Sequence, residues 1–447
     1  MDALAALREA AGEVIEASLC EIQGSWLALV RTQDGKRLAF AAKGENALSA
    51  LWKDVEKEAD VKDVHVSVMA LNANNAALVR RYVKWTAPTA CGTKGASIGF
   101  SDWLGEADAV VAELFGKRQL KPVLVDFTTE DSEALQRYFV QAVDTATWGV
   151  LEEGYKEGYG ANAAGLKTEE EIVKALLYGY SMIGFDCSDK IDLGIEKLSD
   201  EAVDKRFEQF NETFRVAVHA SYLNAEFKVG SSKITFTENQ LHRIVLEYGE
   251  AIMHIQFIYN SYLKNTPWDI DFELDLSKPG KVLTPQEHYL IGNELQRNGI
   301  KLSSICLDPL KDAEAVNDNL QLHCEIADTF GYRLSFKNAD IAMNDTAAAM
   351  KYLKGKVHFK MNNILWMSAI ELAKALDAEL FGKLCAACGC EAAADAADRA
   401  LVLGYRKALN PKEEGNVAAD MKAFLEAHHA EYTAAIKENV AAKLKNI

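Results

Sequence analysis

A capped amphipathic helix and an apolar strand ending in carboxylates follow each other in residues 147–189, TWGVLEEGYKEGYGANAAGLKTEEEIVKALLYGYSMIGFDCSD. Thr168 precedes three glutamates at 169–171, which is the composition of a helix amino terminus. The apolar strand predicted at residues 180–186 then ends at Asp186. Parallel α/β barrels carry their chemistry at the carboxyl ends of their strands. Asp186 is therefore the first candidate for a site residue.

From residue 96 onward, short apolar runs alternate with amphipathic helical segments, which is typical of βα units and a parallel sheet. The predicted strands are residues 96–100, 122–127, 180–186, 270–276, 300–307, 332–336 and 357–361. An eighth strand is expected either near Leu166 or within residues 226–236. The pattern predicts an α/β protein built on a (β/α)8 TIM-type barrel, although an open doubly wound sheet would read similarly.

The flanks of the barrel have their own patterns. Residues 1–92 are expected to form a small α+β domain, with helices at 2–17 and 45–58 and a hairpin at Asp34-Gly35. Residues 93–382 would hold the barrel, with a helical insertion at about 190–266 that we expect to cover the active face. An alanine-rich helical tail is predicted for residues 383–447.

Composition limits the classes of partner and compartment. The formal net charge of −17 argues against a nucleic-acid or anionic-membrane partner, because such partners would repel the chain. No apolar run is long enough to cross a bilayer, so a cytoplasmic protein is expected. The eight cysteines, including Cys385, Cys388 and Cys390, are expected to be small buried residues and not a disulfide frame or zinc site.

Charged and polar side chains cluster at the predicted carboxyl ends of strands. They are Asp102, Asp126, Asp186, Asp189, Asp271, Glu273, Asp275, Asp308, Lys337, His358 and Lys360. Alternation along a strand places Asp271, Glu273 and Asp275 on one face. Asp189 and Asp308 are the best candidates for helix caps. His358 together with Asp186 would suit a divalent cation, although a strand histidine is more often a hydrogen-bonded core residue.

Several runs in the same order resemble the tagaturonate epimerase family of bacterial hexuronate metabolism. They are GVLEEGYKEGYGANAAGLKTEEEI with GYSMIGFDCSD, then SIGFSDWLG, TPQEHYLIGNELQRNGIKLSS, and HCEIADTFGYRLSF leading to GKVHFK. The similarity extends over about residues 96–380. It implies a barrel enzyme that inverts a carbon of a keto-uronate, with a divalent metal cation and either proton transfer next to a carbonyl or retro-aldol chemistry.

The resemblance also implies roles for individual residues. Asp186 matches the aspartate of the family's Asp-Pro-Ser, with Cys187 in place of proline, and His358 matches the histidine of Val-His-Leu-Lys, so both are implied metal ligands. The implied substrate-binding residues are Asp102, Tyr159 and Lys360. Asp102 matches the aspartate of Gly-Asp-Arg-Leu-Gly, with Trp103 in place of arginine. Glu273, Asp275 and Lys337 are the expected catalytic residues.

Three departures from the family pattern leave two hypotheses open. Lys337 stands where the family has histidine, Ile341 where it has aspartate, and Leu276 where it has glutamate. An ammonium at Lys337 would repel a cation unless it lost its proton. The chain is then either an epimerase or isomerase with a rearranged site, in which Lys337 acts as base or Schiff-base amine, or an inactive or repurposed paralogue that binds a sugar acid.

Overall fold

The centre of the molecule is a closed barrel of eight strands. The computed structural model describes residues 2–44, 46–116, 118–276, 283–310, 313–343, 346–391, 395–445 and 447. The barrel strands are β7 (Ser97–Gly99), β8 (Lys121–Thr128), β9 (Gly160–Leu166), β10 (Met182–Asp186), β13 (Asp271–Asp275), β14 (Ser304–Leu307), β15 (Arg333–Phe336) and β16 (Val357–Lys360). They close in the order β10-β13-β14-β15-β16-β7-β8-β9, and every neighbouring pair is parallel. The predicted TIM-type barrel is confirmed, and the open sheet is excluded.

The eighth strand is β9, at the first of the two positions that the sequence left open. The helix after it, α6 (Glu169–Leu177), begins as predicted, because Thr168 accepts from the Glu171 N–H and Glu171 accepts from the Thr168 N–H. The other helices around the barrel are α3 (Asp108–Phe115), α4 (Thr129–Leu135), α5 (Phe139–Glu153), α10 (Pro285–Arg297), α11 (Ala313–Phe330), α13 (Thr346–Tyr352) and α14 (Ile364–Leu376). Each strand therefore delivers its carboxyl end to one mouth of the barrel.

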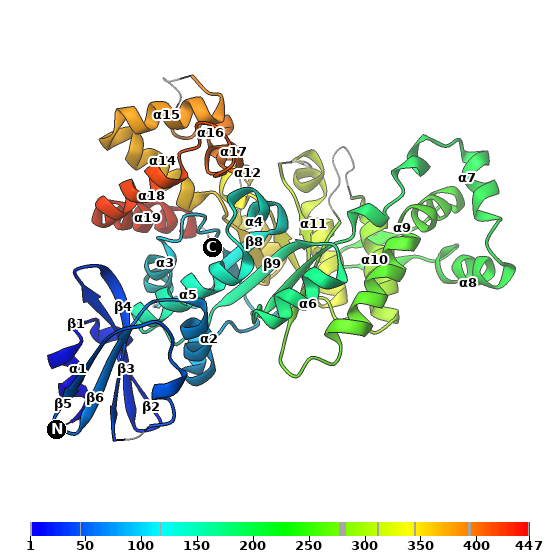
Figure 1. Cartoon of the computed structure of the whole chain (residues 1–447). Coiled ribbons are helices and arrows are strands. Elements are labelled where there is room, and N and C mark those ends of the chain that lie inside the picture. Colours follow the sequence, from blue (N-terminus) through cyan, green and yellow to red (C-terminus); the bar gives the residue numbers. More distant parts are fainter. Residues whose placement is uncertain are drawn as a thin grey trace.

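The amino-terminal part is a small α+β unit beside the barrel (Figure 1). Its helix α1 (Ala3–Ala10) packs on an antiparallel sheet that contains β3 (Ser25–Thr32), β4 (Gly35–Lys43), β5 (Val55–Val61) and β6 (Val64–Met69). The Asp34-Gly35 hairpin is confirmed by the β3–β4 pairing. The helix predicted at 45–58 is wrong: the described residues there form only the 3-10 turn Ser49–Leu51 and then the strand β5, which pairs with β6 along the edge of the sheet. The charged residues of β5 face solvent there, which keeps an edge strand from pairing with other chains.

The insertion between β10 and β13 is helical, with a short hairpin. It contains α7 (Asp200–Phe207), α8 (Glu212–Tyr222), the hairpin β11 (Phe227–Val229) and β12 (Ser232–Ile234), and α9 (Glu238–Ile258). In Figure 1 α7 and α8 lie on the far side of the barrel from the carboxy-terminal helices. The insertion packs its apolar face into the same core as the barrel, through residues such as Leu241, Ile255 and Phe207.

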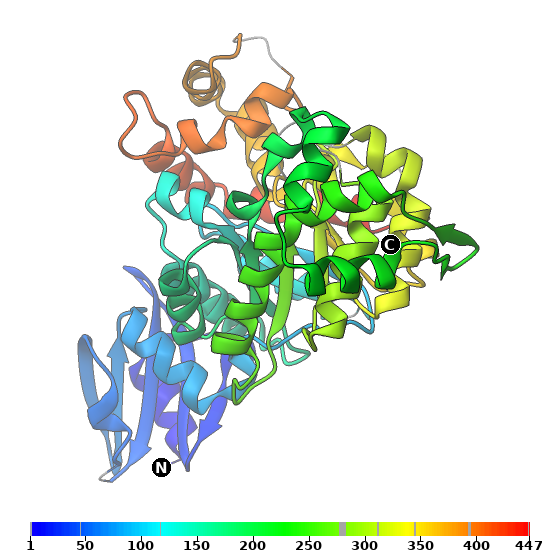
Figure 2. The ribbon, with the colours of Figure 1, turned by 90° about the vertical axis from the view of Figure 1, so that its right-hand side faces the viewer.

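The carboxy-terminal helices pack against the other side of the barrel. They are α15 (Ala378–Cys388), α16 (Arg399–Leu403), α17 (Tyr405–Ala408), α18 (Ala418–Ala427) and α19 (His429–Leu444), and α19 lies against α14 and α3. In Figure 2 the first of these helices (orange) lie at the top of the view and the amino-terminal sheet (blue) lies at the bottom. Every cysteine is a free thiol, as the composition suggested. None of the described helices is long and apolar enough to cross a lipid bilayer.

Candidate active site

A cavity of about 560 Å³ opens at the carboxyl ends of the barrel strands. Polar and charged side chains from β8, β10, β13, β15 and β16 line it, among them Asp126, Asp186, Glu273, Lys337 and Lys360. The cover comes from the carboxy-terminal part, through Leu403, Tyr405 and Arg406. No described residue of the insertion lines this cavity, so the expectation that the insertion covers the active face is wrong.

The cover is held in place by a ring stack and by ion pairs of Arg406 with Glu130 and Asp131. Trp103, which replaces an arginine of the family pattern, stacks on Tyr405 with ring centroids 3.4 Å apart and an interplanar angle of 8°. Arg406 donates from Nε to Asp131 Oδ1 at 2.7 Å. Asp131 also accepts from the Tyr405 hydroxyl. These contacts tie α17 to the start of α4 and place an aromatic wall beside the polar floor.

The floor of the cavity is a buried lysine held between two carboxylates. Lys360 at the end of β16 donates to Glu273 Oε1 at 2.5 Å, and its Nζ lies 3.6 Å from Asp126 Oδ1. Glu273 also accepts from Ser304 Oγ at 2.8 Å, and Asp126 accepts from Asn162 Nδ2 at 2.9 Å. The Lys360, Glu273 and Asp126 side chains are at most 3% exposed. The structure therefore brings two predicted residues, Glu273 and Lys360, into direct contact.

Burial and pairing set the charges of this floor. Burial lowers the pKa of Lys360, but Asp126 and Glu273 outweigh that effect and raise it well above its ordinary value. Burial raises the pKa of Glu273, and Lys360 more than offsets the rise, so that this pKa lies below its usual value. Burial raises the pKa of Asp126. Lys360 lies further from Asp126 than from Glu273, so it offsets only part of this rise. The floor thus combines an ammonium, a firmly ionised carboxylate and a more basic carboxylate.

A second lysine pair stands at the wall. Lys337, at the end of β15, donates to Asp275 Oδ2. Burial lowers the pKa of Lys337, but the charge of Asp275 reverses that effect and leaves the pKa raised. Lys337 is therefore an ammonium, and this pairing does not support a neutral lysine that acts as base or forms a Schiff base. The predicted residues Asp275 and Lys337 meet each other in the cavity.

Three buried oxygens at the floor have no hydrogen-bond partner among the described residues. They are Asp126 Oδ2, Asn162 Oδ1 and Asn362 Oδ1, and the two residues Asp126 and Asn362 line the cavity. Gly99 makes room for the first of them, because a Cβ on Gly99 would lie 2.5 Å from Asp126 Oδ2. Leaving a buried acceptor unsatisfied is costly, so these atoms mark where a hydroxyl-rich ligand would gain hydrogen bonds.

Two residues with a predicted substrate role lie elsewhere and have structural partners. Asp102 accepts from the N–H groups of Gly105, Ala107 and Asp108 at 2.7–3.2 Å, and so fixes the turn before α3. Tyr159 is fully buried at the amino end of β9, where its hydroxyl donates to the Thr86 carbonyl at 2.8 Å. Neither residue lines the cavity, and the substrate-binding role predicted for them is not supported.

Asp186 and His358 do not form a pair. Asp186 lines the cavity at the end of β10, close to Lys167 at 3.6 Å. His358 lies on β16, across the ring from β10, and Ser97 Oγ is 2.9 Å from its Nδ1. His358 lies two residues before Lys360 on β16, so the two side chains face the same way and His358 lies deeper in the barrel. It is completely buried and does not line the cavity. Burial lowers the pKa of His358 to about 3, so the ring is neutral.

The donor set of the cavity does not fit a divalent metal ion. One implied imidazole ligand is Lys337, whose ammonium would repel a cation, and the other, His358, is outside the cavity. Glu273, Asp126 and Asp275 already face lysine ammonium groups. Among the described residues, one group of histidine and acid side chains has metal-binding spacing, and it lies in the insertion: His219, Glu238 and His242.

A second cavity, of about 630 Å³, lies at the amino ends of the strands. Two acids line it, the exposed Asp269 and the buried Asp271. Asp271 is the first of the three acids that share a face of β13, and it accepts from the N–H groups of Cys91 and Gly92 at 2.6–3.2 Å. Asp271 therefore closes the bottom of the barrel, while Glu273 and Asp275 face the mouth. With its buried acid already bonded to backbone N–H groups and its other acid exposed, this cavity offers less to a reaction than the carboxyl-end cavity.

Sequence reasoning missed two contributors to the floor. Asp126 is among the strand-end acids but has no role assigned from the sequence, and no sequence pattern indicates Asn162. Asn162 lies on β9, whose sequence GANAAGL has almost no large apolar residue to indicate a strand. The pairing of Asp126 with Asn162 follows from the β8–β9 register, in which the two residues are partners.

Comparison with known proteins points to one family. The family model of tagaturonate epimerase matches residues 15–433. The tagaturonate/fructuronate epimerase of Thermotoga maritima is 27% identical over 383 residues, which cover 83% of this chain and 78% of that protein.

Solved structures agree on the fold. The crystal structure of fructuronate-tagaturonate epimerase from Cohnella laeviribosi with one glycerol has a TM-score of 0.88 and 24% identity, and covers 99% of this chain and 97% of that one. The native crystal structure of the same enzyme gives the same TM-score and identity, with 99% of both chains covered. Because the family model matches nearly the whole length of this chain, the chain belongs to the tagaturonate epimerase family.

Proposed function

We propose that this protein interconverts tagaturonate and fructuronate in the carboxyl-end cavity. Family membership supports the substrate class, a small keto sugar acid. The observation that carries the proposal is the buried Lys360 between Glu273 and Asp126 at the floor of the cavity. A cation and a basic carboxylate, both buried at one cavity floor, are the groups that chemistry beside a carbonyl needs.

The substrates define the bond that has to break. The tagatose and fructose skeletons differ at C4, which bears a hydroxyl and stands two carbons from the C2 ketone. Its hydrogen is not acidified by an adjacent carbonyl, so a retro-aldol route is favoured over direct removal of that hydrogen. A base takes the C4 hydroxyl proton, and the C3–C4 bond breaks to an aldehyde at C4 and an enediolate at C2 and C3. The aldehyde turns its other face, the bond re-forms, and the proton returns.

In this proposal Asp126 is the base and Lys360 the electrophilic group. The raised pKa of Asp126 and its unpartnered Oδ2 suit a group that accepts a hydroxyl proton. The Lys360 ammonium would stabilise the negative charge that forms on the C2 oxygen. Glu273 keeps Lys360 protonated and in place, and Asp275 does the same for Lys337. The reaction scheme draws on no metal ion at this cavity.

The proposal is tested by following conversion and binding together. Purified wild-type protein, Asp126→Asn and Glu273→Gln are incubated with tagaturonate, and product is measured by NMR. We expect conversion by the wild type and a loss of about 10²–10⁴-fold in Asp126→Asn, the usual contribution of a positioned base. Asp189→Asn, a matched control at an exposed carboxylate that does not line the cavity, should keep its rate. Binding without conversion in the wild type would instead favour an inactive paralogue.

A further inference from the structure

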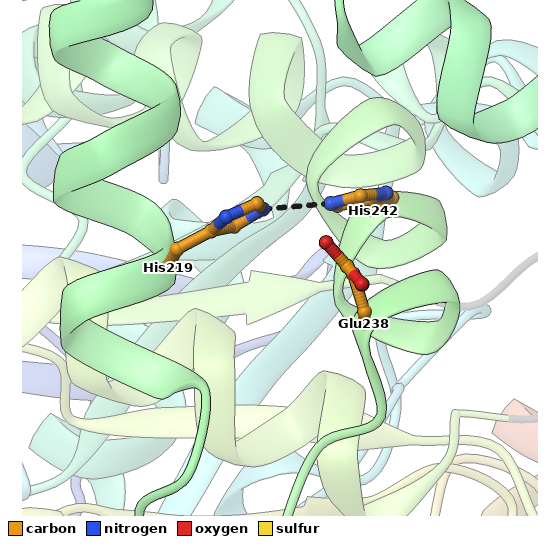
Figure 3. A group of neighbouring side chains, drawn as sticks. All are labelled: His219, Glu238 and His242. Carbon is orange, nitrogen blue, oxygen red and sulfur yellow. Dashed lines mark hydrogen bonds between the residues drawn. The ribbon is translucent and has the colours of Figure 1, made fainter.

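Two histidines and a glutamate meet between helices α8 and α9 of the insertion. Glu238 and His242 are four residues apart on α9 and so share a face, and His219 comes from α8. Their ligand atoms all lie within 4.8 Å of one another, and the two Nε2 atoms of His219 and His242 are 2.8 Å apart. Figure 3 shows the two imidazole edges facing each other, with the Glu238 carboxylate pointing toward the gap.

A second set of contacts orients His242. Its Nδ1 lies 2.7 Å from Asp204 Oδ1, and Asn239 donates to the same oxygen at 3.2 Å. With the proton on Nδ1 donated to Asp204, the Nε2 lone pair points at the gap. A metal-bound histidine usually donates its other ring N–H to a carboxylate, which fixes the tautomer and raises the basicity of the ligand nitrogen.

Packing on Phe207 holds both rings in parallel planes. The Phe207 ring stacks on His242 with centroids 3.8 Å apart and on His219 with centroids 5.4 Å apart. The His242 side chain is 6% exposed, so one side of the gap is shielded from water. Glu238 is exposed and forms the open side, where an ion could enter.

We propose that His219, Glu238 and His242 bind a divalent transition-metal ion, with Zn²⁺ as the best match. Two imidazole nitrogens and one carboxylate oxygen are ligands that Zn²⁺ takes in tetrahedral sites, with Zn–N distances of about 2.0–2.1 Å. That geometry separates two ligand nitrogens by about 3.3 Å, so a rotation that parts the two rings slightly would admit the ion. Water would supply the fourth ligand.

The ion would join α8 to the rest of the insertion. Of the residues of α8, Tyr222 alone is buried, so this helix has little apolar packing of its own. A metal bond from His219 to α9 adds a cross-link that the side-chain packing does not provide. The site is separate from the carboxyl-end cavity, and its occupancy can be measured without any assay of turnover.

The test is a Zn²⁺ titration of the full-length protein after chelator treatment and buffer exchange, followed by calorimetry. We expect one Zn²⁺ per chain in the wild type, and binding about 100-fold weaker or more in His219→Gln and Glu238→Gln. Asp204→Asn, which loses only the outer partner, should weaken binding by about 10–100-fold. His254→Gln is the matched control, because His254 lies on the same helix α9 but outside the cluster.

A melting curve separates metal binding from folding. Without Zn²⁺, Glu238→Gln should melt close to the wild type, since Glu238 is exposed. Added Zn²⁺ should raise the Tm of the wild type and of His254→Gln. It should not raise the Tm of Glu238→Gln or His219→Gln. The proposal is overturned if the wild type binds no Zn²⁺, or if His219→Gln and Glu238→Gln bind it as tightly as the wild type does. The latter result would place the ion elsewhere on the chain.

Discussion

Replacing Lys360 by methionine removes the cation that two buried carboxylates share. Methionine keeps a similar length and apolar stem, so the packing of β16 is retained while the charge is lost. Glu273 loses a 2.5 Å hydrogen bond and Asp126 loses a cation at 3.6 Å. Breaking a buried ion pair from one side costs about 3–5 kcal/mol, because the remaining charge has no compensation. We expect that loss in the free energy of unfolding near pH 8.

The cost should depend on pH in a defined direction. In the wild type Lys360 helps to hold the pKa of Glu273 below its usual value, so Glu273 contributes stability that is present above its unfolded pKa of about 4.3 and is lost as the pH falls through the lower folded pKa. Without Lys360 the carboxylates take up a proton in the folded state. At about 1.36 kcal/mol per pKa unit, a penalty of 3–5 kcal/mol corresponds to a rise of roughly 2–4 units. The difference from the wild type should therefore shrink between pH 8 and pH 5.

Turnover and stability are measured on the same samples. Urea unfolding at several pH values gives the stability, and NMR of tagaturonate conversion gives the rate. Loss of one preorganised electrostatic group lowers kcat by about 10²–10³-fold. The double variant Lys360→Met/Glu273→Gln should regain part of the stability but not the rate, and Lys356→Met, at a surface pair with Asp328, should match the wild type in turnover. A Lys360→Met protein within tenfold of the wild-type rate would refute the assigned role of this lysine.

Three further predictions follow from single positions. Gly99→Ala places a Cβ 2.5 Å from Asp126 Oδ2, so the carboxylate must move. We expect the free energy of unfolding in urea to fall by about 1–3 kcal/mol and the rate to fall by a larger factor. An unchanged rate would contradict this. His358→Gln should flatten the pH dependence of stability. The folded pKa of His358, about 3, lies below the unfolded value of about 6.5, so the wild type loses stability as the pH drops from 6.5 toward 3. The loss is about 2 kcal/mol between pH 6.5 and 5. If His358→Gln showed the same pH dependence of stability as the wild type, the neutral buried ring would be refuted. Tyr159→Phe leaves the Thr86 carbonyl without its donor, at a cost of about 1–3 kcal/mol in urea unfolding, but should leave KM unchanged; a raised KM would restore the substrate role first expected of it.

The barrel was largely readable from the sequence because most of its strands are short apolar runs between helical patterns. The strand β9 was harder, since GANAAGL owes its place to small residues and not to large apolar ones. Gly160 shows why, because a Cβ there would lie 2.9 Å from both Cys91 Sγ and Val123 Cγ2. The edge strand β5 was misread because its charged residues face solvent, which a helix surface would also show.

Individual site residues were easier to predict than their partners. Glu273 and Lys360 were both expected at strand ends, but β13 and β16 are not neighbours in the ring, so only the closed barrel shows that their side chains meet across it. The sequence order likewise put Tyr159 next to a glycine-rich run, without showing that β9 begins directly after it, at the amino end of the barrel. Asp186 and His358 do not meet. His358 and Lys360 are two residues apart on β16, so they face the same way at different depths, and only Lys360 reaches the cavity that Asp186 lines.

We propose that the buried carboxylates and lysine of the barrel mouth invert C4 of a keto-uronate by breaking and remaking the C3–C4 bond. The most direct measurement is proton NMR of tagaturonate with the purified protein in D2O. We expect fructuronate to appear and its C4 position to keep the original hydrogen. Deuterium at C4 of the product, or no fructuronate at all, would contradict it.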